Sequence, residues 1–391
     1  MRRILFAGYA PVHFICFEPI YRRLAKRSDV LVELSGGRDG DDQGRGATTA
    51  SELYGHFPHV PPEQVIELDE MREREYDLVF CAHSSGFFPK VDRGRVQIFH
   101  GLSFRNMAVR RDVLIYDTLF VIGPYQMRSL IENKLFREGS DRLVPTGFAK
   151  LDRLVDGSLS RDHILDDVGL TGERPVLLYA PTGQKRNSLE STGPEVIRRL
   201  RDTGEYDILI KLHDHPRDRA ERGRDEIKSM LDEHTRMVTG FDVVPYLYAA
   251  DLLISDASSV SMEYSLLDRP VVYLDVPELI EAVKRKKKGS FDLETWGRKG
   301  GTVARWPDEA VRAVEWSLEN PDAHGEIRRA MARDLFYNVG TATDAAERWI
   351  LAELGLEAHA GRSTPGPGAP ASGRETRSQA SGSPGTSRVE R

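Results

Sequence analysis

The chain has 391 residues, of which 40% are hydrophobic and 30% charged, and it carries a formal net charge of −6. This length allows two domains and a tail, the composition is that of a globular protein with buried cores, and the negative charge gives no indication of nucleic-acid binding. The two cysteines, Cys16 and Cys81, are too few for a disulfide framework or a cysteine-rich metal site and suit a reducing compartment.

The N-terminal stretch MRRILFAGYAPVHF has a basic start, but its apolar run breaks at Gly8 and again at Pro11. This pattern favours a first β-strand over a signal peptide. No stretch of the chain approaches the roughly 18 uninterrupted apolar residues that a membrane span needs. We therefore expect a cytoplasmic protein, with peripheral contact to the inner face of the cell membrane as a further possibility.

Apolar runs that predict strands alternate with amphipathic segments that predict helices. The first set has predicted strands at 3–9, 30–35, 77–83, 96–100 and 119–123, with helices at 18–27 and 125–136. The second has predicted strands at 175–182, 207–213, 236–240, 252–255 and 271–275, with helices at 193–204, 218–233 and 260–268. Short apolar strands alternating with helices are typical of parallel sheets covered on both faces. Two such sets predict two α/β domains, divided near 155–175, and the Gly/Ser/Pro-rich C-terminal tail is predicted to be disordered.

Parallel sheets of this kind bind ligands at the carboxyl ends of their strands. Four polar clusters stand just after predicted strands: His100 to Arg105, Pro181-Thr182-Gly183, His213 with His215, and Asp256-Ala257-Ser258-Ser259. Each has a simpler interpretation, since a glycine can make a turn, a serine can cap a helix and a lone histidine is often structural. Four clusters at the same kind of position favour a binding site.

The last cluster, at 256–259, lies where a buried strand turns into a predicted helix. Ser258 and Ser259 at the start of that helix, with unpaired backbone N–H groups behind them, predict an anion site that favours phosphate. Asp256 is acidic and should not face a phosphate directly. It is expected to orient a neighbouring histidine, to hold a turn or to accept a hydrogen bond from a hydroxyl.

Several familiar motifs are missing from the sequence. There is no Gly-rich dinucleotide fingerprint after the first strand, no P-loop, no HExxH and no GxSxG, which argues against the chemistries that use them. Acidic residues do not cluster at metal-ligand spacing, so we expect no tightly bound metal and no cofactor. The basic run at 284–288 is best read as a solvated loop; the alternative is attraction to anionic lipid head groups, at about 1 kcal/mol per charge, or to a polyanionic acceptor.

The polar blocks, in this order, resemble the CDP-glycerol glycerophosphotransferase family, which includes teichoic-acid primases and polymerases. The matching stretches are HGLSFRN (100–106), PTGFAKLDRL (145–154), LLYAPTG (177–183), IKLHDHP (210–216), ADLLISDASSVSMEYSLLDRPVVYLD (250–275) and FYNVGTATDAAERWI (336–350). The resemblance extends over roughly residues 75 to 355. The block at 250–275 is the most similar of the six.

The resemblance implies a GT-B-like architecture in which two Rossmann-like domains face a cleft. The N-terminal acceptor-side domain would then comprise residues 1–150 and the nucleotide-binding domain 151–340. A helix at 341–356 would return to the first domain, followed by the tail at 357–391.

The resemblance also implies a reaction. His100 would take a proton from an acceptor hydroxyl, which attacks the β-phosphate of CDP-glycerol and expels CMP; the near-neutral pKa of an ordinary histidine suits this task. His213 or His215 would stabilise charge on the pyrophosphate, with His213 favoured because it is nearer the strand end. Ser258 and Ser259 would hold phosphate.

Further residues of the matching blocks would line the donor site. Thr182 and Gly183 would lie on the nucleotide side, with Gly101 and Asp256 also in the binding region. Arg105 stands where the family usually has a lysine, which differs from arginine in geometry. The terminal block departs from the family pattern at two further positions, since Val339 replaces a common acidic residue and Ala345 a common arginine.

The expected partners are CDP-glycerol or a related CDP-polyol and a lipid-linked or polymeric acceptor, in the synthesis of a cell-surface polymer. A GT-B sugar-nucleotide enzyme, either a glycosyltransferase or a relative of the UDP-sugar 2-epimerases, is the alternative because one fold serves all these chemistries. A non-catalytic nucleotide-binding or surface-assembly protein is the third hypothesis.

Overall fold

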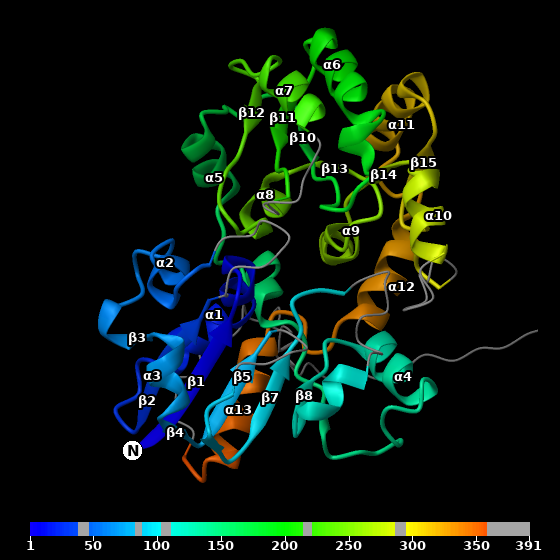
Figure 1. Cartoon of the computed structure of the whole chain (residues 1–391). Coiled ribbons are helices and arrows are strands. Elements are labelled where there is room, and N and C mark those ends of the chain that lie inside the picture. The colour runs from blue at the N-terminus through cyan, green and yellow to red at the C-terminus, as the bar shows by residue number, and fades with distance from the viewer. Residues whose placement is uncertain (38–46, 83–87, 103–110, 214–220, 286–294, 358–391) are drawn as a thin grey trace, which may run out of the picture. The chain divides into compact units, whose positions relative to one another are not determined.

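The computed structural model describes residues 1–37, 47–82, 88–102, 111–213, 221–285 and 295–357. Residues Met1–Leu356 form one compact unit. The predicted disorder of the tail concerns residues that, from 358 onward, lie outside the described part of the chain. Within the compact unit, the described residues form two larger sheets and one two-stranded sheet (Figure 1).

The first sheet has seven strands in the order β3-β2-β1-β5-β7-β8-β9, and every neighbouring pair is parallel. Its strands are β1 Arg2–Gly8, β2 Val30–Gly36, β3 Val65–Ile66, β5 Leu78–Cys81, β7 Arg95–Ile98, β8 Thr118–Phe120 and β9 Leu143–Val144. The strand order reverses direction between β1 and β5. The two-stranded sheet pairs β4 Glu75–Tyr76 with β6 Val91–Asp92.

The second sheet has six parallel strands in the order β12-β11-β10-β13-β14-β15. They are β10 Val176–Tyr179, β11 Asp207–Ile210, β12 Thr235–Met237, β13 Leu252–Ser255, β14 Val271–Leu274 and β15 Thr302–Ala304. This is the 3-2-1-4-5-6 order of the Rossmann fold, whose ligands bind where the order reverses. Here the reversal lies between β10 and β13.

Helices connect the strands of both sheets. They are α1 Pro11–Leu24, α2 Ala50–Tyr54, α3 Leu68–Arg72, α4 Pro124–Glu132, α5 Arg161–Val168, α6 Gly193–Thr203, α7 Glu221–Lys228, α8 Val244–Ala249, α9 Val260–Tyr264, α10 Pro277–Arg285, α11 Pro307–Glu319, α12 Gly325–Leu335 and α13 Ala342–Glu353. Short 3-10 helices include η4 Ala149–Leu154, η5 Ser188–Glu190 and η6 Ser265–Leu267. The central strands are buried along their whole length, as the continuous apolar runs predicted.

The helix predicted at 18–27 is wrong at its start, because α1 begins at Pro11 and contains Pro19 in its interior. A proline there lacks the N–H that would bond one turn back. Phe17 and Ile20, on either side of it, are both buried in one core, and this packing offsets the lost bond. The predicted divide at 155–175 also contains a helix, α5, which Ser160 caps.

The chain returns to the first sheet at its C-terminal helix. Helix α13 packs against α1, where Arg23 bonds Glu347 at 3.0 Å, and its Trp349 ring lies edge-on to Phe120 of β8, with the centroids 5.1 Å apart. Asp152 of η4 accepts hydrogen bonds from the backbone of Ala342 and Thr343 at the start of α13. Residues Met1–Leu356 form one unit without a division at 150 or 340, so the two predicted domain boundaries stay predictions.

Candidate functional site

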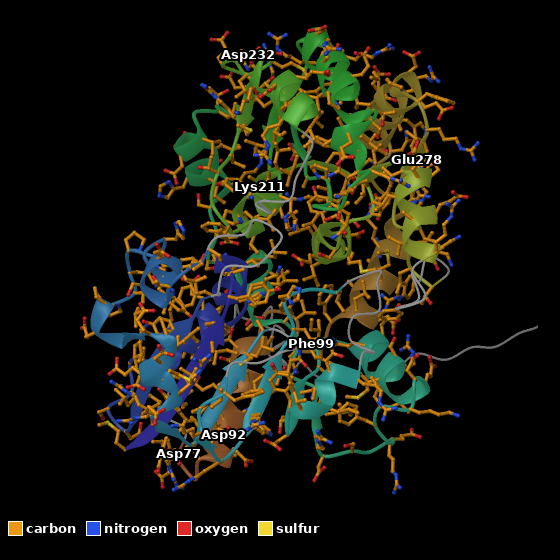
Figure 2. All side chains as sticks on the ribbon, in the orientation of Figure 1. Asp77, Asp92, Phe99, Lys211, Asp232 and Glu278 are labelled. Atoms are coloured by element: carbon orange, nitrogen blue, oxygen red, sulfur yellow. The ribbon has the colours of Figure 1, made fainter. Side chains whose placement is uncertain are left out.

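The strand order brings the predicted polar clusters to the same ends of the two sheets. Figure 2 shows Asp77 and Asp92, which precede β5 and β7, at one end of the first sheet, and Phe99, which follows β7, at the other. In the second sheet Lys211 follows β11 and Asp232 precedes β12, and they too lie at opposite ends. The carboxyl ends of β1, β5 and β7 are neighbours, as are those of β11, β10 and β13.

His100 follows β7 and is oriented by the end of the neighbouring strand. Its Nδ1 lies 2.8 Å from the carbonyl oxygen of Ala82, which follows β5. A carbonyl can only accept a hydrogen bond, so Nδ1 carries the proton and Nε2 of the neutral ring holds a lone pair. This is the tautomer in which Nε2 can accept a proton from a substrate hydroxyl.

A second histidine, His13, lies against His100 and was missed by the sequence analysis. It belongs to the first turn of α1 and is 2% exposed, and the two ring centroids are 5.3 Å apart with the rings tilted by 46°. The signal was present in the stretch GYAPVHF, because His13 follows the first strand at the same edge of the sheet.

Gly101 brings the block after β7 next to the serines after β13. A Cβ atom placed on Gly101 would lie 3.5 Å from the Ser259 hydroxyl oxygen, which is ordinary van der Waals contact. The structure therefore places the His-Gly block and the Ser-Ser block side by side, although they are more than 150 residues apart in the sequence.

Ser259 is the N-cap residue of α9, but its side chain makes no capping hydrogen bond to the helix. The simple capping interpretation therefore does not describe Ser259. Ser258 is nearly buried, and its carbonyl accepts from the Ser261 hydroxyl at 2.8 Å. The predicted helix at 260–268 is an α-helix only to Tyr264 and continues as the 3-10 helix η6. Because α9 is this short, attraction for an anion comes from the N–H groups of its first turn more than from the dipole of a long helix.

Asp256 is fully buried and holds the loop that follows β10. One carboxylate oxygen accepts from the Thr182 backbone N–H at 2.8 Å, and the other accepts from the Ser188 N–H at 2.9 Å and its hydroxyl at 2.8 Å. Burial raises the pKa of Asp256, and the hydrogen bonds from Ser188 and Thr182 oppose that rise. Asp256 thus holds a turn and accepts from a hydroxyl, two of the three roles that the sequence left open.

The sequence analysis did not single out Asn187 or Ser188, which complete this loop. Asn187 is fully buried, donates from its side-chain amide to the Thr182 carbonyl at 2.6 Å, and accepts from the Glu190 N–H at 3.1 Å. The residue before it, Arg186, has a φ of 65°, a left-handed conformation that a non-glycine residue adopts rarely. The loop is therefore fixed by side chains on both sides of its bend.

Gly183 and His213 are in direct contact across β10 and β11. A Cβ atom on Gly183 would lie 2.5 Å from Cγ and 2.7 Å from Nδ1 of His213, closer than real contacts allow. The imidazole therefore lies directly on the glycine, and a residue with a side chain fits there only if the ring moves away. His213 is exposed, so it lies on the surface of this strand-end cluster.

A buried ion pair joins the segment at 145–154 to α9 and was also missed. Lys150 Nζ and Glu263 Oε1 are 2.9 Å apart, with side chains 7% and 1% exposed. Burial alone would lower the pKa of Lys150, but the attraction of Glu263 outweighs it and the pKa is raised. Nothing in the sequence marks this contact, because it joins residues 113 positions apart.

Two predicted site residues, Arg105 and His215, lie outside the described residues, as do Lys286 to Lys288 of the basic run. Lys284 and Arg285 end α10, where Arg285 pairs with Glu281 at 2.9 Å. Within the described ranges, no three His, Cys, Asp or Glu side chains gather as metal ligands would. Nor do those same ranges contain a helix with the length and hydropathy of a membrane span.

The two parallel sheets and their polar strand ends define a GT-B-like protein. The wall teichoic acid polymerase TagF has the same fold, with a TM-score of 0.61 over 90% of this chain and 89% of that one at 16% identity. So does Staphylococcus aureus MnaA with UDP, at a TM-score of 0.57, 14% identity, and 91% and 98% coverage. The predicted fold class is confirmed.

The chain belongs to the family described as CDP-Glycerol:Poly(glycerophosphate) glycerophosphotransferase, whose model matches residues 90–349. This confirms the resemblance seen in the sequence. The teichoic acid glycerol-phosphate primase of Bacillus subtilis is 33% identical over 192 residues, which are 48% of this chain and 43% of that protein. The Bacillus spizizenii primase is 24% identical over 206 residues, 51% and 48% of the two chains. The chain thus spans about half the length of these curated relatives.

Proposed function

We propose that the protein transfers a polyol phosphate, most simply glycerol phosphate, from a CDP-activated donor to an acceptor hydroxyl and releases CMP. The observation that carries this proposal is the orientation of His100: its Nδ1–H donates to Ala82, which makes Nε2 the proton acceptor of the neutral ring, and the next residue, Gly101, lies close to Ser259. Membership of the glycerophosphotransferase family supports the choice of donor.

In the proposed reaction, His100 Nε2 removes the proton of the acceptor hydroxyl as its oxygen attacks the β-phosphorus of CDP-glycerol. A bond forms between that oxygen and the β-phosphorus, and the bond from the β-phosphorus to the bridging oxygen breaks. The bridging oxygen leaves with CMP, and the glycerol phosphate is left on the acceptor as a phosphodiester. General base catalysis of this kind contributes roughly 10²- to 10⁴-fold to a rate.

The donor would be held by the strand ends of the second sheet. Ser259 and the first-turn amides of α9 would bind phosphate, with Ser258 next to them, while Thr182 and Gly183 would line the nucleotide side. Support comes from the position of these residues at the β10/β13 reversal, where Rossmann folds bind nucleotides. His213, on the surface of the same cluster, would stabilise negative charge as the pyrophosphate breaks.

Two residues outside the described ranges keep the roles that the family resemblance implies. Arg105 would bind the transferring phosphate, and His215 is the alternative to His213. The acceptor is proposed to be lipid-linked or polymeric, in the synthesis of a teichoic-acid-type polymer. Relatives named as glycerol-phosphate and as ribitol-phosphate enzymes both match this chain, so the polyol must be tested directly.

The test measures thermal stabilisation by CDP-glycerol, CDP-ribitol, UDP-N-acetylglucosamine and CMP, followed by CMP release from each CDP donor with a glycerol-phosphate-primed acceptor. A ligand that binds only the folded protein raises its melting temperature. We expect stabilisation by the CDP compounds and CMP release that depends on the acceptor. Stabilisation by the UDP-sugar alone would overturn the proposal in favour of a sugar-nucleotide enzyme, and CDP binding without turnover would favour a binding protein.

A further inference from the structure

We propose that His13 is a positioning residue for His100, which it holds in the tautomer and orientation in which Nδ1 donates to Ala82 and Nε2 is the proton-accepting nitrogen. The inference rests on the proposed function of His100, but it concerns a residue that lies outside the segment matched by the family model. It is carried by the packing of His13, by the hydrogen bond at its own ring and by its contact with His100.

His13 is built tightly into the end of the first sheet. A Cβ atom on Gly8, the last residue of β1, would lie 2.7 Å from Cβ and 3.1 Å from Nδ1 of His13. Only glycine therefore allows the His13 side chain to lie against this strand. The Tyr9 ring packs edge-on against the His13 ring, with centroids 4.4 Å apart. With 2% exposure, the imidazole has a single well-defined place.

The hydrogen bond at its ring makes His13 a neutral imidazole with a defined tautomer. The Tyr9 backbone N–H donates to His13 Nδ1 at 3.3 Å, so Nδ1 accepts and Nε2 carries the proton. Protonation of Nδ1 would replace this bond with two opposed N–H groups. His13 thus adds no positive charge beside His100.

The two rings have opposite tautomers and touch. His100 is protonated at Nδ1, and His13 at Nε2, and their centroids are 5.3 Å apart. A rigid ring on this side limits rotation of the His100 ring about its own side-chain bonds. Rotation would turn Nδ1 away from Ala82 and Nε2 away from the acceptor hydroxyl.

Three charged side chains on α1 and on elements packed against it pair with groups other than His13. Lys150 of η4 pairs with Glu263, Asp152 of η4 binds the start of α13, and Arg23 bonds Glu347 of α13. Cys16, one turn after His13, is buried, and burial raises the pKa of its thiol to about 12. The surroundings of His13 therefore favour a fixed, neutral ring.

The test combines kinetics with ¹⁵N NMR of histidine-labelled protein, whose imidazole shifts report the tautomer of His100 without any need for activity. His13→Ala removes the ring, and His13→Phe keeps an aromatic ring of similar size. His59→Gln is the matched control, because His59 also lies in the first sheet's domain but pairs with Glu18 at 2.9 Å.

For His13→Ala we expect a mixture of His100 tautomers and a roughly 10- to 100-fold lower kcat, the cost of a displaced catalytic group. The Kd for CDP should change less than twofold. His13→Phe should recover part of kcat, and His59→Gln should match the wild type. If His13→Ala does not fold, His13→Phe still reports the His100 tautomer and kcat.

An unchanged His100 tautomer together with an unchanged kcat in His13→Ala would overturn the inference, and so would a folded His13→Phe protein that recovers neither the tautomer nor any part of kcat. Failure of the proposed function looks different. In that case the wild type would transfer no polyol phosphate, while the ¹⁵N spectrum would still show whether His13 fixes His100.

Discussion

The carboxyl ends of the two sheets have the same topology but are built in different ways. After β7, one catalytic candidate, His100, is oriented by the backbone carbonyl of Ala82 and lies against the ring of His13. After β10 and β13, Asp256 alone accepts three hydrogen bonds from Thr182 and Ser188 and is fully buried. The first arrangement fixes the tautomer of a catalytic candidate, and the second uses its charged group to fix a loop.

This contrast separates two kinds of residue that look alike in a sequence. The polar atom of a residue after a strand can bind a ligand directly. Alternatively, it can form hydrogen bonds within the protein that fix the loop to which the ligand binds. The hydrogen bond to Ala82 makes Nε2 the proton-accepting nitrogen of the neutral His100 ring, whereas both oxygens of Asp256 are engaged by protein donors. We therefore expect changes at the first sheet to lower turnover and changes at the second to lower stability and donor binding.

The largest effect is expected at His100. His100→Ala should lower kcat about 10³-fold, because it removes the base that takes the acceptor proton. Its urea midpoint and its Kd for CDP should stay close to those of the wild type, since the half-buried ring makes few of the core contacts. Acceptor-dependent CMP release measures the first quantity. Full turnover in this variant would remove His100 from the mechanism. It would also contradict our expectation that changes at the first sheet lower turnover.

The next effect concerns the ion pair that links the two regions. Lys150→Met should destabilise the protein by about 3–5 kcal/mol, because it leaves Glu263 charged, buried and unpaired. Urea denaturation gives this value. The double variant Lys150→Met/Glu263→Met is the control and should regain most of the loss, since an apolar pair fits a buried site. A single variant as stable as the wild type would show that water reaches Glu263.

Asp256→Asn tests the second sheet by itself. An asparagine has the same shape, but its NH₂ group would face N–H or O–H donors, so we expect a loss of about 2–3 kcal/mol in unfolding free energy and weaker CDP binding. Ser188→Ala, which removes only one donor, should cost about 1 kcal/mol. If Asp256→Asn keeps its stability but loses kcat, Asp256 acts on the substrate and our distinction between the sheets is wrong.

The sequence predicted the parts of the molecule that depend on local pattern. Buried parallel strands appear as short apolar runs, so the central strands of both sheets were predicted within a few residues, and the polar clusters followed from strand ends. The two-residue strands β3 and β9 are too short to give such a pattern. Helix α1 was misplaced because Pro19 usually marks a helix start.

The site was predicted less completely because its supporting contacts are distant in sequence. Ser188 meets Asp256 across 68 positions and Lys150 meets Glu263 across 113, and no local spacing encodes either pair. His13 is different, since the rule that selected His100 would also have selected it after the first strand. The rule that parallel sheets bind ligands at the carboxyl ends of their strands predicts where a site lies. It does not predict which polar atoms there contact a ligand and which form hydrogen bonds within the protein.

The smallest effect we predict lies within the second sheet. Gly183→Ala places a Cβ atom 2.5 Å from the His213 ring, so the ring must move off the loop. Because His213 is exposed and can rotate outward, we expect little change in the free energy of unfolding. The displaced ring should instead lower kcat/KM with CDP-glycerol roughly tenfold, which is within the range of overpacking penalties. Gly94→Ala is the matched control, since its Cβ would lie 3.0 Å from the flexible end of Leu78 and at an ordinary contact distance of 3.8 Å from the Asp77 carbonyl oxygen.

A double-mutant cycle with His213→Ala decides whether this loss acts through the imidazole. If the displaced ring is the cause, Gly183→Ala should add almost nothing in a protein that already lacks His213, and the two effects will not be additive. Additive effects would instead mean that the Cβ atom blocks the nucleotide directly. In that case Gly183 itself contacts the donor, and the second sheet would present an open binding surface as well as a fixed loop.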